Sequence, residues 1–217
     1  MLEEIKEKLS LLHKDLFKSD LVAWTSGNIS EFVREKGLVV IKPSGVKYDD
    51  LEPKSFPVVD LKGKKVEGEF SPSTDMMSHL YIYNNNKDIN GIVHTHSTFA
   101  TAFCANQKSI PCYLTAQADE FGGEIPCAKY SAIGGSEIGE AVIETLKKTK
   151  SKSVLLSNHG VFSVGSDSHS ALKTAVMTED CAKTAFWALK LGDAKELSES
   201  EISENWERYQ SSYGQKK

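Results

Sequence analysis

Residues 90–96 read Asn90-Gly91-Ile92-Val93-His94-Thr95-His96, and no other stretch says as much about the fold and its use. The apolar start predicts a short β-strand, in which alternate side chains point to the same face. The two imidazoles should therefore emerge side by side, as two nitrogen ligands of one metal ion do. A third histidine, His159, follows another short apolar run. This pattern predicts an enzyme with a histidine metal site that keeps one coordination position open.

The composition is that of an ordinary globular protein. The chain has 217 residues, of which 40% are hydrophobic and 26% charged, and a formal net charge of −4. This charge and the lack of a long basic block argue against a nucleic-acid partner. No apolar run reaches the roughly 20 residues of a membrane span, and the acidic N-terminus does not resemble a secretory signal. We expect a cytoplasmic protein without a membrane partner, whose four cysteines, lacking CxxC spacing, are reduced.

The predicted elements alternate along the chain. Apolar periodicity and capping residues predict helices at residues 2–16, 75–82, 98–105, 136–148 and 167–191. Short apolar runs predict strands at residues 37–41, 58–61, 65–68, 91–94, 125–130 and 154–156. A polar tail closes the chain from residue 192, and no linker or repeat divides it. The sequence predicts one α/β domain over residues 1–217, with a mixed or mainly antiparallel sheet between helices.

Other residues are candidates to complete the metal site. Asp75 offers a hard oxygen ligand at the start of a predicted helix, and His79 lies one turn later on the same side. The sequence leaves open which of the two approaches the metal. Three imidazoles and an oxygen suit Zn²⁺, while Mn²⁺ or Co²⁺ fit the same ligands. His13 and His169 lie in polar helical patterns, and we interpret both as surface residues.

Three short loops predict an anion site. Residues 25–28, 42–45 and 71–74 are rich in serine, threonine and glycine, and Lys42 adds a positive charge. Hydroxyls and exposed backbone N–H groups in such turns suit a phosphate, above all where a loop precedes a helix. Asp119 lies beside apolar and glycine residues, where the plain interpretation is a loop cap. We therefore expect a phosphorylated small molecule to bind near the metal.

Taken together, these motifs resemble the L-ribulose-5-phosphate 4-epimerases, in the superfamily that also contains the class II aldolases for fuculose and rhamnulose 1-phosphates. The resemblance covers nearly the whole chain and rests on residues 27–30, 41–46, 73–75, 94–97, 118–119, 125–127, 159–160 and 213–215. The HTHS and KPSG blocks specify the superfamily. Asp119 and the sequence Tyr213-Gly214-Gln215 point to the epimerase branch. The resemblance implies a class II aldolase-like fold.

The resemblance also implies a role for each motif. The implied metal site consists of His94, His96 and His159, with Asp75 at or beside the ion. The implied substrate- and phosphate-binding residues are Gly27, Asn28, Lys42, Ser44, Gly45, Ser73 and Thr74. Asp119 and Tyr213 match the acid–base pair of the family. A homotetramer is implied, in which the tail, residues 192–217, carries the tyrosine to the site of a neighbouring subunit.

The implied reaction interconverts L-ribulose 5-phosphate and D-xylulose 5-phosphate. The C4 hydrogen is not adjacent to the carbonyl, so inversion requires cleavage and re-formation of the C3–C4 bond. A class II sugar-phosphate aldolase is the first alternative, although aldolases usually have glutamate where this chain has Asp75. Gln117 also departs from the epimerases, which carry histidine there. The second alternative is a non-catalytic metal-binding assembly protein, which would be expected to show a broken ligand or acid–base set.

Overall fold

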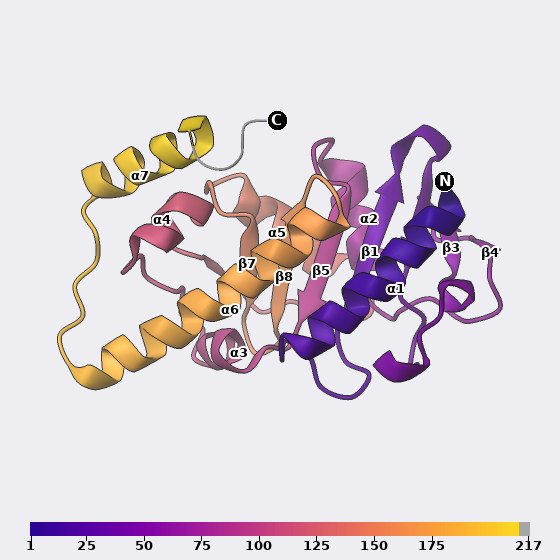
Figure 1. Cartoon of the computed structure of the whole chain (residues 1–217), viewed down its shortest axis with the longest axis horizontal. Helices are drawn as coiled ribbons and strands as arrows, with labels where there is room; N and C mark the ends of the chain where they lie inside the picture. Colours follow the sequence, from indigo (N-terminus) through magenta and orange to yellow (C-terminus); the bar gives the residue numbers. More distant parts are fainter. Residues whose placement is uncertain (213–217) are drawn as a thin grey trace.

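The core of the molecule is one sheet whose central strands are buried on both faces. The computed structural model describes residues 1–212, in which eight strands lie in the order β4-β3-β2-β1-β5-β8-β7-β6 (Figure 1). The strands are β1 (Asn28–Val33), β2 (Leu38–Ile41), β3 (Val58–Asp60), β4 (Lys65–Glu67), β5 (Gly91–Thr95), β6 (Cys127–Ala128), β7 (Ser153–Leu156) and β8 (Val161–Gly165). All neighbouring pairs are antiparallel except β6 and β7. The predicted mixed, mainly antiparallel sheet is confirmed.

Helices cover both faces of this sheet (Figure 1). They are α1 (Leu2–Lys18), α2 (Met76–Asn85), α3 (Thr98–Ala105), α4 (Thr115–Phe121), α5 (Glu137–Leu146), α6 (Ser168–Leu191) and α7 (Glu199–Ser212). Short 3₁₀ turns occupy Arg34–Lys36, Tyr48–Asp50 and Pro53–Ser55. In β2, Val40 packs with α1 and α6, whereas Val39 and Ile41 pack with α2 and α5. Because successive side chains alternate between two buried faces, the strand sequence is continuously apolar.

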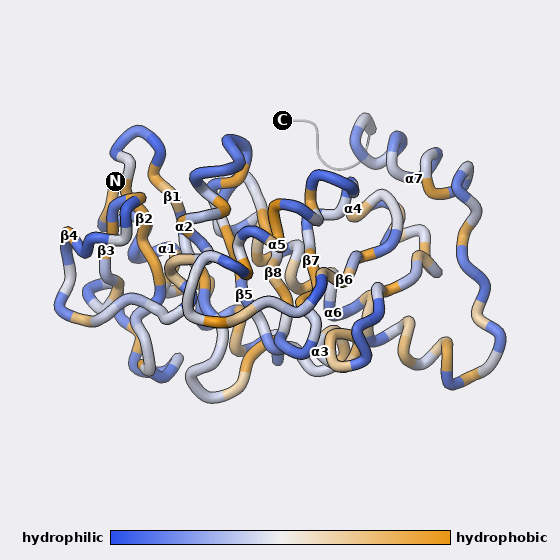
Figure 2. Tube along the Cα trace, turned by 180° about the vertical axis from the view of Figure 1, so that it is seen from behind, coloured by the Kyte–Doolittle hydropathy of each residue, from blue (hydrophilic) through white to orange (hydrophobic). Residues whose placement is uncertain are grey.

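The distribution of hydropathy follows this layering. Figure 2 shows hydrophobic residues gathered along the central strands, while α7 is largely hydrophilic. Within residues 1–212, no helix combines the length and the apolar character needed to cross a membrane.

The C-terminal segment differs from the predicted polar tail. Residues 199–212 form α7, which packs against α4 of the same chain (Figure 1). Arg208 forms an ion pair with Asp119 at 3.1 Å, and Tyr209 donates a hydrogen bond to Glu120. The sequence did not predict either helix. None of the residues of α7 is buried, so its apolar period is weak, and α4 has only seven residues, too few to show one. Asp119 therefore lies in a helix rather than capping a loop, and Tyr213 falls outside the described residues.

The interpretation of His13 as a surface residue is wrong. Its side chain is fully buried between α1 and the sheet. The amide of Ile29 donates to Nε2 at 3.0 Å, so the proton must lie on Nδ1, which donates to the Leu9 carbonyl at 2.6 Å. Burial lowers the pKa of His13 to about 3. A neutral imidazole thus joins α1 to β1, whereas His169 is exposed as predicted.

We predict that His13 makes stability depend on pH. The native pKa of about 3 lies below the unfolded value of 6.5, so the unfolded chain binds more protons between these values. The free energy of unfolding should therefore fall on acidification, with His13 contributing up to about 1.4 kcal/mol per pH unit. His13→Gln should be less stable at neutral pH but should lose this part of the slope.

Urea unfolding of the metal-free protein, from neutral pH to about pH 4.5, measures this dependence. His169→Gln, which changes an exposed histidine, is the matched control. Equal slopes in the wild type and in His13→Gln would contradict the assignment.

Candidate active site

A cavity of about 540 Å³ opens where β5, the turn between β7 and β8, and three loops meet. The predicted metal-binding and substrate-binding residues all line it: Gly27, Asn28, Lys42, Ser44, Gly45, Ser73, Thr74, Asp75, His94, His96 and His159. These residues come from five separate segments of the chain. Folding therefore joins the predicted metal motif and the predicted anion loops in one chamber.

The three histidines converge because β5 pairs with β8. The register places His94 opposite Phe162, just beyond the β7–β8 turn that carries His159. One candidate ligand atom from each histidine lies within 4.8 Å of the others, and the Nε2 atoms of His94 and His96 are 3.0 Å apart. The side-by-side placement expected from the HxH spacing is present.

The protonation of these rings suits a divalent metal ion. His94 Nδ1 donates to the Val161 carbonyl at 3.0 Å, which leaves the Nε2 lone pair directed at its neighbours. Burial lowers the pKa of His94 to about 3 and also lowers the pKa of His96 and His159. Within residues 1–212, the buried Nδ1 of His159 has no hydrogen-bond partner. Neutral imidazoles with converging or unpartnered nitrogens are a donor set that fits such an ion.

Gly160 allows the rings to approach one another. A Cβ atom at this position would lie 2.4 Å from the Thr95 carbonyl oxygen and 2.8 Å from Cδ2 of His96. Such separations are far below van der Waals contact, so a larger residue would displace the end of β5 or the His96 ring. The glycine that follows His159 in the sequence is thus required by the packing of the ligands.

The structure separates the two candidates that the sequence left open. Asp75 lines the cavity, and its Oδ2 accepts a hydrogen bond from Asn28 at 2.7 Å, although it lies outside the cluster of three histidines. Burial alone would raise the pKa of Asp75, but His94 and the other neighbours lower it overall. His79 is buried away from the cavity, where its Nδ1 bonds the Ser30 hydroxyl at 2.7 Å. An anionic carboxylate therefore stands beside the histidine cluster.

Lys42 connects the anion loops to one another. Its buried ammonium donates to the carbonyl oxygens of Thr25 at 3.2 Å, Val46 at 3.1 Å and Pro43 at 3.4 Å. Burial lowers its pKa to about 8, while Asp75 opposes this shift, so the side chain is mainly protonated at neutral pH. Lys42 therefore braces two loops and supplies positive potential to the cavity wall.

The third anion loop joins the same network. The Ser73 amide donates to the Lys42 carbonyl at 2.9 Å, and its hydroxyl accepts from Asn28 at 3.1 Å. Gly27 adopts φ 74°, and a Cβ there would meet the His94 carbonyl oxygen at 2.8 Å. A residue with a side chain is strained in that conformation and has no room. The loop containing Gly27 and Asn28 thus packs directly on the strand that carries the metal motif.

Two lining residues were missed from the sequence. Ile133 and Gly134 form part of the cavity wall, and Ile133 is 71% exposed. Their signal was the Gly134-Gly135 pair after the predicted strand at residues 125–130. The predicted acid–base residue Asp119 does not line the cavity, because it faces Arg208 of α7.

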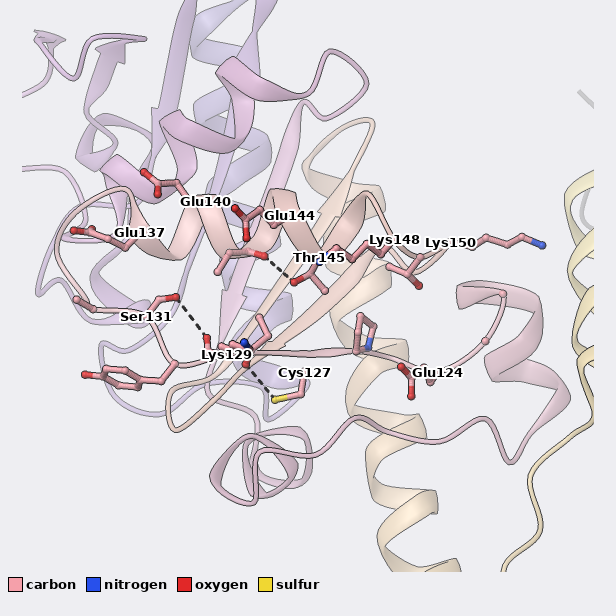
Figure 3. Close-up of a pocket in the computed structure, with 18 residues that line it drawn as sticks. Glu124, Cys127, Lys129, Ser131, Glu137, Glu140, Glu144, Thr145, Lys148 and Lys150 are labelled. Carbon is pink, nitrogen blue, oxygen red and sulfur yellow. Dashed lines mark hydrogen bonds between the residues drawn. The ribbon is translucent and has the colours of Figure 1, made fainter.

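A second, larger cavity of about 1050 Å³ lies between α5 and the segment that includes Cys127 and Ser131 (Figure 3). The carboxylates of Glu137, Glu140 and Glu144 follow one side of α5 along it. Its lining contains no histidine and none of the residues predicted for the site. Chemistry that needs converging metal ligands therefore belongs to the smaller cavity.

The chain is similar in sequence and in fold to known sugar-phosphate enzymes. The profile of the class II aldolase and adducin N-terminal domain matches residues 7–186. The chain is 38% identical to L-ribulose-5-phosphate 4-epimerase UlaF of Salmonella paratyphi C (strain RKS4594), over 89% of each chain. A solved L-fuculose 1-phosphate aldolase is 30% identical with a TM-score of 0.89, covering 95% of this chain and 96% of its own. The L-fuculose-1-phosphate aldolase of Thermus thermophilus is 25% identical with a TM-score of 0.70, covering 85% and 95%. The chain belongs to the class II aldolase and adducin family.

We predict that a divalent metal ion stabilises the fold through the histidine cluster. A ligand that binds only the native state at a hundred times its Kd raises the free energy of unfolding by about 2.7 kcal/mol. Chelator-treated protein should therefore unfold at a higher temperature after Zn²⁺ is added. His96→Ala should lose most of this increment, while His169→Ala should keep it. Thermal unfolding with and without the metal measures the effect, and an undiminished shift in His96→Ala would contradict the site.

Proposed function

We propose that this chain is a metal-dependent L-ribulose-5-phosphate 4-epimerase. The observation that carries the proposal is a single cavity in which the histidine cluster, Asp75 and three anion-type loops meet. The 38% identity to an epimerase over 89% of both chains supports the choice of reaction. Zn²⁺ is the expected metal because imidazole-rich sites suit it, although Mn²⁺ or Co²⁺ fit the same donors. The reaction is an isomerisation within carbohydrate metabolism.

The loops hold the phosphate of the substrate. Ser44, Gly45, Ser73 and Thr74 offer hydroxyls and backbone N–H groups at the cavity wall, and the last two precede the N-terminus of α2. A helix N-terminus and nearby positive charge both favour a phosphate dianion. Lys42 contributes that charge while it fixes the loops. With its phosphate held, the aldehyde fragment stays in the cavity after C3–C4 cleavage and can present its other face.

The histidine cluster holds the reacting end of the substrate. When bound there, a divalent cation would supply Lewis-acid stabilisation of the negative charge that develops on the C2–C3 fragment. The Val161 carbonyl fixes the tautomer of His94 and thus the direction of its free lone pair. Asp75 is held in place by Asn28 and places a negative charge beside the cluster.

Asp119 and Tyr213 are the proposed acid–base pair, and we place both in the site of a neighbouring subunit. Asp119 lies outside the cavity of its own chain and is paired with Arg208, five residues before Tyr213. Asp119 lies in α4, which packs against α7. If the end of α7 lies at the site of a neighbouring subunit, Asp119 therefore lies near that site as well. A closed homotetramer, with each subunit serving the next, accommodates this arrangement. Proton transfer at the C4 hydroxyl of both epimers needs groups on opposite sides.

A class II sugar-phosphate aldolase is the second candidate, because the solved L-fuculose 1-phosphate aldolase matches with a TM-score of 0.89. Asp75 favours the epimerase, since aldolases usually carry the longer glutamate at this position. A non-catalytic metal-binding assembly protein would bind metal without turnover.

We expect metal-loaded protein to convert L-ribulose 5-phosphate into D-xylulose 5-phosphate without releasing aldehyde. A coupled assay for the xylulose phosphate, run with a trapping enzyme for free aldehyde, tests this directly. Stoichiometric release of aldehyde would instead establish an aldolase. Metal binding with neither product, across a panel of pentulose phosphates, would favour the non-catalytic protein.

We also predict how inactive variants complement one another. Tyr213→Phe and Asp119→Asn should each keep metal but lose most turnover. Each variant is mixed with an equal amount of His96→Ala and the tetramers are reassembled, and activity should return. About a quarter of the sites then take intact histidines from one chain and an intact acid–base pair from the neighbouring chain. A mixture of Asp119→Asn with Tyr213→Phe should regain no activity. Each site receives both residues from one neighbouring subunit, and in this mixture every subunit lacks one of them. Recovery in that last mixture would contradict a shared origin for the pair.

A further inference from the structure

Helix α3 begins directly after the HxH motif, yet its own cap residue does not secure it. Ser97 is the N-cap residue and makes no side-chain capping bond. Within residues 1–212, its buried hydroxyl has no hydrogen-bond partner at all. The first amides of a helix have no partners inside the helix, so another group must satisfy them.

Glu179, on α6, takes this role from a distant part of the chain. Its Oε1 accepts from the Phe99 amide at 2.8 Å, and its Oε2 accepts from the Ala100 amide at 2.9 Å. Both bonds are charge-assisted, and a carboxylate at a helix N-terminus also interacts favourably with the helix dipole. The ring of Phe99 packs edge-on against Phe186 at 5.4 Å, which adds an apolar contact between α3 and α6. The start of α3 is therefore attached to α6 at a defined position.

His96 depends on this attachment more than the other two ligands do. His94 is buried in β5 and its ring is held by the Val161 carbonyl. His96 lies beyond the end of β5, where its side chain is exposed overall although the cavity partly desolvates its ring. Within residues 1–212 that ring hydrogen-bonds only to the His94 ring. Its place is set by the backbone, which runs from the β5 ladder on one side to the first turn of α3 on the other.

The far end of α3 holds the turn that carries His159. The Asn158 amide donates to the Cys104 carbonyl at 3.0 Å, and the Gln107 side chain donates to Asn158 Oδ1 at 3.0 Å. The Cys104 thiol donates to the Gly160 carbonyl at 3.2 Å. A single helix thus adjoins His96 at its start and supports His159 from its end.

We infer that Glu179 is a positioning residue of the metal site, which acts by anchoring α3. Through this anchor it sets the separation of His96 and His159 and so the affinity and geometry of a bound divalent cation. The inference rests on the proposed metal-dependent function and assigns no contact between Glu179 and the ion or the substrate. It concerns a carboxylate that lies 80 and 79 residues along the chain from the two amides it binds.

The chain offers a matched control. Glu31, on β1, accepts from the Ser168 amide at 3.0 Å and from the Ser168 hydroxyl at the start of α6, and it forms an ion pair with Lys8 at 2.6 Å. It lies opposite Gly91, at the end of β5 remote from His94. Glu31→Gln therefore removes a buried charge that bonds the start of a helix, together with its ion pair to Lys8, without touching α3.

The experiment measures Zn²⁺ affinity by chelator competition, and the visible spectrum of bound Co²⁺, which reports coordination geometry. Wild type, Glu179→Gln, Glu179→Asp and Glu31→Gln are compared, each with the unfolding temperature of its metal-free form. Glu179→Gln should bind Zn²⁺ about tenfold more weakly, at the low end of the cost of losing a direct partner of a ligand, because Glu179 acts through the backbone of α3. Its Co²⁺ spectrum should also change. Glu179→Asp, which keeps the charge, should be intermediate, and Glu31→Gln should bind Zn²⁺ as the wild type does.

Three results would overturn the inference. Wild-type affinity and spectrum in both Glu179 variants would show that the anchor does not govern the ligands. Equal weakening in Glu179→Gln and Glu31→Gln, in step with their unfolding temperatures, would show only a general loss of stability. Failure of the wild type itself to bind Zn²⁺ or Co²⁺ would reject the metal site and with it the proposed function, which the other two results leave standing.

Discussion

The antiparallel pairing of β5 with β8 is the constraint on which the rest of the site depends. It places His94 opposite Phe162 and so brings the β7–β8 turn, with His159, to the end of β5. The same pairing aligns the Val161 carbonyl with His94 Nδ1. A shift of one residue would turn the His94 side chain to the other face of the sheet, so the site requires this register. Gly160 then allows the rings to approach, since any Cβ there would clash with the backbone of β5.

Burial governs the electrostatics of the cavity. It keeps the three imidazoles neutral by lowering the pKa of each, so their lone pairs are available near neutral pH. The same burial lowers the pKa of Lys42 only to about 8, because Asp75 lies close enough to oppose the shift. One wall of the cavity therefore carries a positive charge among the proposed anion loops, and another carries neutral imidazole nitrogens that can accept a metal ion. A phosphorylated substrate that also chelates a metal needs both features in a single chamber.

The described residues, 1–212, bring the proposed binding residues together in one cavity but leave Asp119 outside it. Asp119 is held by Arg208 on α7, away from the cavity that contains the histidines. This separation supports a division of labour in which one subunit binds the substrate and the next supplies proton transfer. The contacts of α3 show a similar principle within one chain, because Glu179 of α6 secures a helix that adjoins two ligands.

The sequence by itself indicated six of the eight strands, the HxH pair and the loop compositions, because these depend on local periodicity and residue chemistry. It did not reveal β1 or β8, whose strand pairing only the folded sheet shows. It also predicted the sheet type. The residues that it proposed to bind metal or substrate, through the family resemblance, all line the cavity. Only the tertiary structure decided the rest. His13 lies in a polar helical pattern, and only the Ile29 amide packed against it shows that it is buried. Asp75 rather than His79 faces the cavity because Ser30 of β1 takes the His79 ring. Glu179 has no local signal at all, since a carboxylate gains its role as a cap only when folding brings a distant helix end to it.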